Sequence, residues 1–237
     1  MLEFLLLSII LFIIWIILFA FKSDLRKEMT LASIFTMSFG LTEPLFVPKY
    51  WNPDTLFNLA KTTGFDIESL IFSFAIGGIG AVLYEIFFKL KHIKISKHEM
   101  HMARHRIHYL ALSSPVIIFL ILFFTTRLNP IYLAIISMFF GALATLYCRP
   151  DLKNKIWLGG FLFLIIYFIS FLLTIFIYPN WVEAAWNLKA ISGMLILMIP
   201  LEELVFAFTF GMLWSSIYEH FNWYKLNKEV KNGKKYW

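Results

Sequence analysis

Seven apolar stretches constrain the fold of this chain more than any other feature. They lie near residues 2–21, 29–47, 67–88, 109–126, 131–148, 156–178 and 190–221. A helix of about 20 apolar residues is long enough to cross the hydrocarbon core of a bilayer. The chain is 60% hydrophobic and only 15% charged, with a mean hydropathy of +0.75, which excludes an ordinary soluble domain. We therefore expect an all-α membrane protein with seven transmembrane helices.

The basic residues alternate along the chain in a way that predicts its orientation. Of the 21 Lys and Arg, 17 lie in the segments 22–28, 89–108, 149–155 and after residue 221. The other four, on the opposite side of the predicted membrane, are Lys49, Lys61, Arg127 and Lys189. Because cytoplasmic loops are enriched in Lys and Arg, this asymmetry predicts a multi-pass protein of the cytoplasmic membrane, with its amino terminus outside and its carboxyl terminus in the cytoplasm. The net charge of +6 is then mainly a topology signal, with anionic lipid as a secondary contact, and no nucleic-acid partner is expected.

The third and seventh stretches share residues at a constant offset of 134. The aligned pairs are Glu68 with Glu202, Leu70 with Leu204, Phe72 with Phe206, Phe74 with Phe208, Gly77 with Gly211, and Tyr84-Glu85 with Tyr218-Glu219. This register predicts an internal duplication, with three-span repeats at 1–89 and 131–221. A basic loop and a connector span fill 90–130, and 222–237 form a basic cytoplasmic tail. Because three spans are an odd number, the connector restores a parallel orientation of the two repeats.

Glu202 and Glu203 stand next to each other in the last apolar stretch, just after Pro200. A charge inside a bilayer is costly, so an intramembrane acid indicates a functional site. A proline inside a helix removes one backbone hydrogen bond, and we expect a kink here beside the two acids. The alternative, a buried pair of acids that fixes helix packing through hydrogen bonds, stays open at this point.

Two further acids are expected at a similar depth in the outer half of the membrane. Glu68 should lie in the first turn of its helix, with Asp66 as the N-cap, and Glu43 lies about 14 residues into the second stretch. Our hypothesis is that the Glu202/Glu203 side supplies a proton and that Glu68 accepts one. For Glu68 a simple helix-terminus charge is the alternative. Glu85 and Glu219, near the cytoplasmic ends of their helices, are interpreted as interfacial charges.

Phenylalanines follow the acids in both copies, in a chain that contains 27 of them. Phe72 and Phe206 lie one helical turn beyond Glu68 and Glu202, so each shares a helix face with its acid. Aromatic rings beside an acid can stabilise a carbocation through their negatively charged faces, although packing against lipid would use the same residues. Small residues let helices approach closely, and the positions expected to do so are Gly77, Gly78, Gly80 and Gly211.

Five of the six histidines lie between residues 92 and 108. If this loop were helical, His98, His101, His105 and His108 would share one face, and His101 and His105 would have the spacing of a metal-binding pair. Lys and Arg residues alternate with them, which favours a solvated basic loop, so we expect no metal site. Dinucleotide-binding and P-loop motifs are absent from the sequence, and no cofactor is expected.

The segment Pro200-Leu201-Glu202-Glu203-Leu204-Val205-Phe206 follows the pattern Pro-x-Glu-Glu-x-x-Phe. In a chain with tandem three-span units, this pattern resembles the small membrane-integral lycopene β-cyclase family, whose members occur as heterodimers or as fused tandem chains. Tyr50-Trp51-Asn52-Pro53 is similar to the outer-loop motif of the first unit. In the first unit Asp66 and Ser69 replace the proline and the second glutamate, so the first repeat is divergent.

The resemblance implies an isomerase of the lycopene β-cyclase type that works without a cofactor on a membrane-dissolved polyene or isoprenoid. An acid protonates a terminal alkene, an internal double bond attacks the cation, and a base removes a proton. The candidate catalytic residues for this chemistry are Glu202, Glu203, Glu68 and Glu43, and the candidate substrate-binding residues are Phe72, Phe74, Phe206, Phe208, Trp51 and Pro200. A small proton-coupled transporter, or a non-catalytic membrane protein that uses the buried acids for packing, remains the alternative.

Overall fold

The computed structural model describes residues 2–228, apart from the side chains of Lys61, Arg104 and Lys228. Within the described residues, five helices are long and apolar enough to cross a membrane. They are α1 (Glu3–Phe21), α5 (Ile67–Phe88), α7 (His108–Thr125), α8 (Pro130–Cys148) and α9 (Lys153–Ile177). The all-α membrane class is thereby supported, as is a multi-pass membrane protein. Five of the seven expected spans are found as single long apolar helices.

The other two expected spans are built differently. The stretch 29–47 consists of α2 (Arg26–Met37), a 3-10 segment η2 (Ser38–Thr42) and the short α3 (Glu43–Phe46). The stretch 190–221 begins with a two-stranded hairpin of β2 (Leu195–Ile196) and β3 (Ile199–Pro200), and only then continues as α11 (Leu201–Asn222). Helix α2 has only 12 residues, and α11 has 22 residues but is not apolar enough to count as a candidate span, so seven spanning helices are not confirmed.

Pro200 does not kink a helix, and that prediction is wrong. It is the N-cap of α11, which starts at Leu201. Proline is favoured at the beginning of a helix because no backbone N–H is needed there. Glu202 and Glu203 consequently lie in the first helical turn, as Glu68 does in α5. The expected N-cap Asp66 is confirmed, since its Oδ1 accepts the backbone N–H of Ser69 at 2.5 Å.

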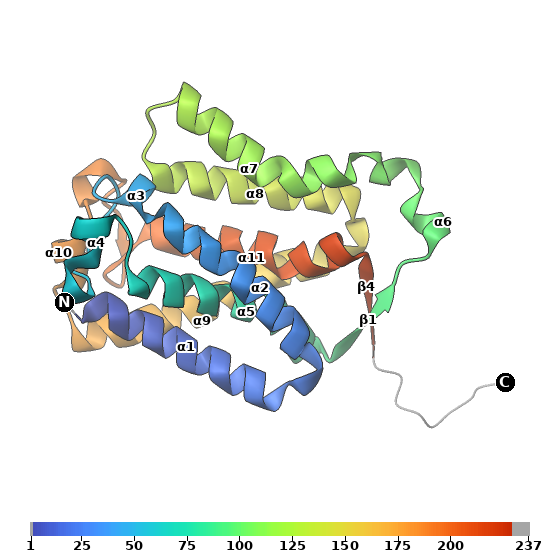
Figure 1. Ribbon diagram of the computed structural model, residues 1–237, viewed down its shortest axis with the longest axis horizontal. Helices are drawn as coiled ribbons and strands as arrows, with labels where there is room; N and C mark the ends of the chain where they lie inside the picture. Colours follow the sequence, from blue (N-terminus) through green and yellow to red (C-terminus); the bar gives the residue numbers. More distant parts are fainter. Residues whose placement is uncertain (1, 229–237) are drawn as a thin grey trace.

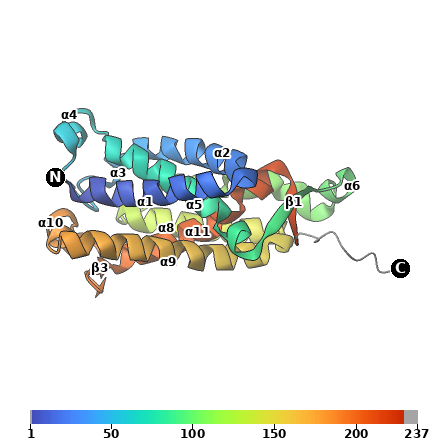
Figure 2. The same ribbon diagram turned by 90° about the horizontal axis from the view of Figure 1, so that it is seen from below.

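The long helices form two layers, which Figure 2 shows from the side. One layer holds α1, α2 and α5, and the other holds α8, α9 and α11. In the first layer α5 packs against both α1 and α2, and in the second layer α11 packs against both α8 and α9. Helix α7 packs mainly against α8 at the edge of the molecule, as Figure 1 shows. The core lies where α5 and α9 meet α11 between the layers.

Matching backbone segments join the two layers at both ends. At one end β1 (Leu90–Lys94) pairs with β4 (Tyr224–Lys228) in antiparallel fashion, and each strand follows a left-handed residue that ends a long helix, Lys89 with φ 50° and Trp223 with φ 58°. At the other end an antiparallel bridge joins Trp51 to Trp186. Figure 1 shows β1 and β4 at one end of the molecule and α10 (Trp181–Ala185), which directly precedes Trp186, at the other. The remaining short elements are η1 (Ser23–Leu25), η3 (Leu56–Asn58), α4 (Leu59–Thr63), α6 (Lys97–Met100), η4 (Ala103–Ile107), η5 (Pro150–Leu152), α10 (Trp181–Ala185) and η6 (Leu188–Ala190).

The expected close-packing glycines are confirmed as contact points between helices. A Cβ atom on Gly77 would lie 2.9 Å from the carbonyl oxygen of Ala32 in α2. A Cβ atom on Gly211 would lie 2.8 Å from the carbonyl oxygen of Gly159 in α9. Both distances are too short for real carbon–oxygen contacts with backbone. These glycines therefore allow α5 and α11 to approach their neighbours closely.

We expect Gly211→Leu to destabilise the protein by about 1–3 kcal/mol, because the added side chain forces α11 away from the backbone of α9. The measurement is the melting temperature in detergent, followed by fluorescence-detected size exclusion. Val205→Leu, at a partly exposed position of the same helix, is the matched control and should melt close to the unmodified protein. Equal melting temperatures for the two variants would show that the contact at Gly211 is not needed.

Candidate functional site

A cavity of about 440 Å³ lies between the two layers. Helices α5, α7, α8, α9 and α11 contribute to its walls, together with η2 and α3. Most of the lining is apolar or aromatic, and its rings include Phe39, Phe72, Phe119, Phe206, Phe210 and Trp214. Two carboxylates line the same space, Glu43 from the first layer and Glu203 from the second. The cavity thus combines an apolar wall with two acids from different parts of the chain.

Glu203 is held by three side-chain donors. Tyr50 Oη donates to its Oε1 at 2.6 Å, Tyr167 Oη donates to its Oε2 at 2.5 Å, and Trp186 Nε1 donates to its Oε1 at 3.2 Å. The carboxylate is 6% exposed and also lies at the amino-terminal end of α11. Donors on both oxygens suit a carboxylate, which only accepts hydrogen bonds. Burial and the neighbouring Glu203 charge raise the pKa of Tyr50 well above its ordinary value, so this phenol stays a neutral donor.

Glu43 has fewer partners than Glu203. Ser69 Oγ donates to its Oε2 at 2.9 Å, while its Oε1 is buried and has no hydrogen-bond partner among the described residues. A buried carboxylate oxygen without a donor is costly unless it carries a proton. The two cavity acids therefore differ chemically, one surrounded by donors and the other with an oxygen open towards its apolar surroundings.

Glu202 and Glu68 are buried but are not among the residues that line the cavity. Glu202 Oε1 accepts from Tyr132 Oη at 2.7 Å and from the backbone N–H of Ser192 at 2.9 Å. Glu68 Oε1 accepts from the backbone N–H of Leu56 at 2.7 Å. Each acid thus ties a loop to the start of its own helix. The structure brings together Glu43 and Glu203, and it directs Glu202 and Glu68 to other partners.

The six residues expected to bind substrate divide in the same way. Phe72, Phe206 and Trp51 line the cavity, whereas Phe74, Phe208 and Pro200 do not. Phe74 packs against Trp15 with ring centroids 5.0 Å apart, and Phe208 packs against Phe161 at 4.9 Å. Successive positions in a helix are 100° apart, so residues two apart face different sides. A Phe-x-Phe pattern therefore places only one of its two rings in the cavity.

Sequence reasoning missed the donors to Glu203. In the sequence prediction Tyr50 has a place only as part of an outer-loop motif, and Tyr167 and Trp186 have none. Tyr167 is the one tyrosine within the apolar helix α9, and it is 2% exposed. The hydroxyl of a tyrosine buried at the centre of a span usually has a hydrogen-bond partner, so Tyr167 in its apolar surroundings is the signal in the sequence that indicates one.

A second buried charge cluster lies at the β1–β4 end. Lys155 Nζ contacts Glu85 and Glu219, the latter at 2.5 Å, and lies 3.6 Å from Glu28. His92 Nε2 lies 2.7 Å from Glu219. The interpretation of Glu85 and Glu219 as interfacial charges is wrong, because they are 2% and 0% exposed and pair with an ammonium. Since Lys155 already lies among the carboxylates, this cluster contains its own cation, and we assign it to holding α2, α5, α9 and α11 together.

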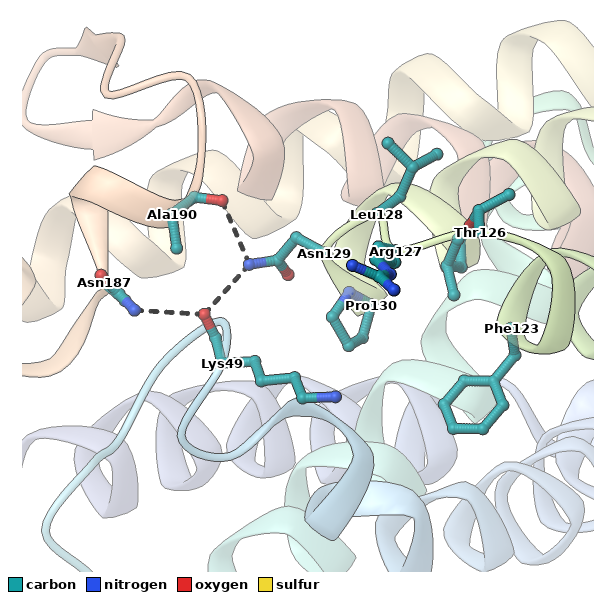
Figure 3. Close-up of a pocket in the computed structure, with 10 residues that line it drawn as sticks. Lys49, Phe123, Thr126, Arg127, Leu128, Asn129, Pro130, Asn187 and Ala190 are labelled. Atoms are coloured by element: carbon teal, nitrogen blue, oxygen red, sulfur yellow. Dashed lines mark hydrogen bonds between the residues drawn. The ribbon is translucent and has the colours of Figure 1, made fainter.

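A surface pocket of about 450 Å³ lies near the carboxyl end of α7 and is shown in Figure 3. Its lining carries Lys49 and Arg127 but no acid. Asn129 Nδ2 donates to the carbonyl oxygens of Lys49 at 3.0 Å and Ala190 at 3.3 Å, which joins the segments after α3 and α10 to the start of α8 (Figure 3). Without an acid this pocket has no group for proton transfer to an alkene, so we assign it to the packing of these loops.

Fold and cavity together define a class: a multi-pass helical membrane protein with two carboxylates in an aromatic, largely apolar cavity. Residues 129–221, which contain α8, α9 and α11, match the family model described as Lycopene cyclase. The match confirms the resemblance seen in the sequence and supports a carotenoid cyclase function. No curated protein and no solved structure gives a significant match.

Proposed function

We propose that this protein is a cofactor-free carotenoid cyclase of the lycopene type, which closes a ring at the end of a membrane-dissolved polyene. The observation that carries the proposal is the meeting of Glu43 and Glu203 in one aromatic cavity. Ring closure initiated by a proton is an isomerisation, so it needs an acid, a base and a dry site that stabilises positive charge. The two acids and the rings of Phe72 and Phe206 supply these needs.

In our assignment Glu43 is the acid and Glu203 is the base. Glu43 carries its proton on Oε1, the oxygen without a hydrogen-bond partner, and transfers it to the terminal double bond. An internal double bond then attacks the resulting cation and forms the new carbon–carbon bond. Glu203, an acceptor held by Tyr50, Tyr167 and Trp186, removes one proton and restores a double bond. One proton enters and one leaves, so substrate and product have the same composition.

This assignment differs from the sequence hypothesis, in which Glu202/Glu203 donate and Glu68 accepts. We propose that Glu202 and Glu68 are positioning residues. Glu202 holds the turn at Ser192 against α8, and Glu68 holds the segment at Leu56 against α5. Both act through the loops that cover the outer end of the cavity.

Substrate reaches the cavity sideways from the bilayer in this proposal. Three residues that line the cavity are also on the surface: Phe39 on η2 is 40% exposed, and Val116 and Leu120 on α7 are 53% and 47% exposed. The gap between η2 and α7 is therefore an apolar opening towards lipid. A cavity of about 440 Å³ accommodates the reacting end of a polyene, while the rest of the chain extends through this opening.

We also infer that the two layers are the two copies of a duplicated three-helix unit with α7 as connector. Support comes from α5 and α11, each of which packs against both other helices of its layer. Lys89 and Trp223 also end these two helices in the same left-handed conformation, and Trp51 pairs with Trp186 across the layers. The distribution of Lys and Arg further supports a cytoplasmic location for the β1–β4 end, in the cytoplasmic membrane.

Expression in a lycopene-accumulating bacterial host tests the function. Chromatography and mass spectrometry of the carotenoids should show a product of unchanged mass with one or two closed rings. Unchanged lycopene, accompanied by proton-coupled uptake of a solute, would support the transporter instead. Unchanged lycopene without such uptake would leave the acids a packing role and would end the cyclase proposal for this substrate.

Tyr50→Phe should slow ring formation by about tenfold to a hundredfold, because Glu203 loses one of its two phenol donors while the ring remains. The measurement is the initial rate of product formation in isolated membranes at matched protein levels. Tyr178→Phe, a partly buried tyrosine at the end of α9, is the control and should retain activity. Equal rates in both variants would mean that Tyr50 does not support the reacting carboxylate.

A further inference from the structure

Two histidines and the single cysteine come together at the β1–β4 end of the molecule, far from the aromatic cavity. His105 belongs to η4, His108 begins α7 and Cys148 ends α8. The three residues are 6%, 2% and 0% exposed, and one ligand atom from each lies within 4.8 Å of the others. The three side chains therefore come together from η4, α7 and α8, and no short sequence motif contains all of them.

The distances in this cluster fit a tetrahedral metal site. The Nδ1 atoms of His105 and His108 lie 3.5 and 3.9 Å from Sγ of Cys148. A tetrahedral zinc ion with usual Zn–N and Zn–S bond lengths places nitrogen and sulfur roughly 3.6 Å apart. Two imidazoles and a thiolate are also the donor set that zinc prefers over magnesium or calcium.

The neighbouring rings hold these donors in place. His108 stacks on Trp223 with ring centroids 3.8 Å apart, and His105 meets the same indole edge-on at 5.1 Å. His220 lies 4.6 Å from the His108 ring, is fully buried, and its Nε2 has no hydrogen-bond partner within residues 2–228. A buried imidazole nitrogen without a partner, on a ring next to His108, is a second and independent indication of a ligand in this region.

The nearby positive charge does not prevent cation binding. The guanidinium of Arg149 is directed to Asp151 at 2.7 Å and to the carbonyl oxygens of Glu219 and Tyr224, so its charge is compensated. A thiolate at Cys148 would further reduce the charge of a bound divalent ion. Cys and His clusters on the cytoplasmic side of a membrane more commonly bind metal than form disulfides.

The pair considered from sequence is not the one that the fold assembles. His101 is exposed, and its Nδ1 contacts the carbonyl oxygen of Lys97 at 2.6 Å, so it does not join His105. The segment is not one continuous helix, because α6 ends at Met100 before η4 begins. The expectation of a solvated loop therefore holds for His101 but not for His105 and His108.

We propose that His105, His108 and Cys148 bind one zinc ion, which fastens the loop between β1 and α7 to the end of α8. The site is separate from the cyclase cavity, and the inference stands whether or not the protein closes rings. This end of the molecule is built from short strands and a loop, and the zinc ion would stabilise their arrangement. Chelation should accordingly loosen the loop and lower the melting temperature.

The test uses the full chain purified in detergent without a histidine tag, loaded with zinc and desalted. Elemental analysis should find about one zinc per chain. Cys148→Ser and His108→Gln should each weaken binding by at least about tenfold. His101→Ala, an exposed histidine in the same loop, is the matched control and should bind like the unmodified chain. Absence of stoichiometric zinc, or full retention of zinc in Cys148→Ser, would overturn the proposal.

Cobalt(II) gives a readout that does not depend on the folding of variants. Cobalt bound by a thiolate shows strong near-ultraviolet charge-transfer absorption and a tetrahedral visible spectrum. Both should appear when the unmodified protein is titrated with cobalt and disappear when zinc is added. Cobalt binding with no thiolate band would exclude Cys148 as a ligand and contradict the site.

Discussion

Glu203→Gln should reduce ring formation by at least about a hundredfold, the usual scale for loss of a general base. The amide keeps the size of the side chain and leaves Tyr50, Tyr167 and Trp186 in place, but it cannot take up a proton. Glu43→Gln should have a comparable effect because the proton donor is lost. The measurement is the amount of cyclised product formed by membranes with equal amounts of each protein.

Glu202→Gln is the matched control for Glu203→Gln, since the two positions are adjacent and both are buried. In our account it retains activity within about tenfold, because its contacts are with Tyr132 and Ser192 outside the cavity. If Glu202→Gln abolished ring formation and Glu203→Gln did not, the assignment of the base would be wrong. The sequence hypothesis, in which either acid of the pair donates the proton, does not predict this asymmetry.

Lys155→Met should destabilise the protein by about 3–5 kcal/mol, because it removes the ammonium from among three buried carboxylates and leaves only His92 beside them. We expect loss of folded protein from the membrane, measured by fluorescence-detected size exclusion at increasing temperature. Lys153→Met, an exposed lysine in the same helical turn, should have little effect.

A rescue variant separates charge from packing. Adding Glu85→Gln and Glu219→Gln to Lys155→Met removes two of the stranded charges and should restore much of the melting temperature. If the triple variant were no more stable than Lys155→Met alone, the aliphatic part of Lys155 would be the important contact, and the cluster would not act as an ion-pair network.

Much of the fold could be predicted because long apolar helices follow directly from length and hydropathy. The expected stretches 67–88 and 131–148 agree with α5 and α8 within about one residue, and Asp66 was correctly placed as an N-cap. The hairpin before α11 was missed because its residues are as apolar as those of a helix. Pro200 was the available signal, since proline more often begins a helix than interrupts one.

The site was only partly predictable, for a physical reason. Periodicity shows which residues share a helix face, but it does not show which loop reaches back to that face. Glu203 and Glu43 were candidates from sequence, while Tyr50 and Trp186 reach Glu203 from loops that sequence does not place. Lys155 was assigned to a cytoplasmic loop because it lies just before an apolar stretch, and only the packing of α9 against α5 and α11 places it in the protein interior.

Isotope incorporation tests proton-initiated cyclisation most directly. Membranes containing the protein are equilibrated in D₂O, supplied with unlabelled lycopene and analysed by mass spectrometry of both product and recovered substrate. If Glu43 delivers an exchangeable proton to the alkene, each ring formed should add one deuterium, and recovered lycopene should stay unlabelled. Cyclised product without deuterium would contradict the proposed role of the cavity acids.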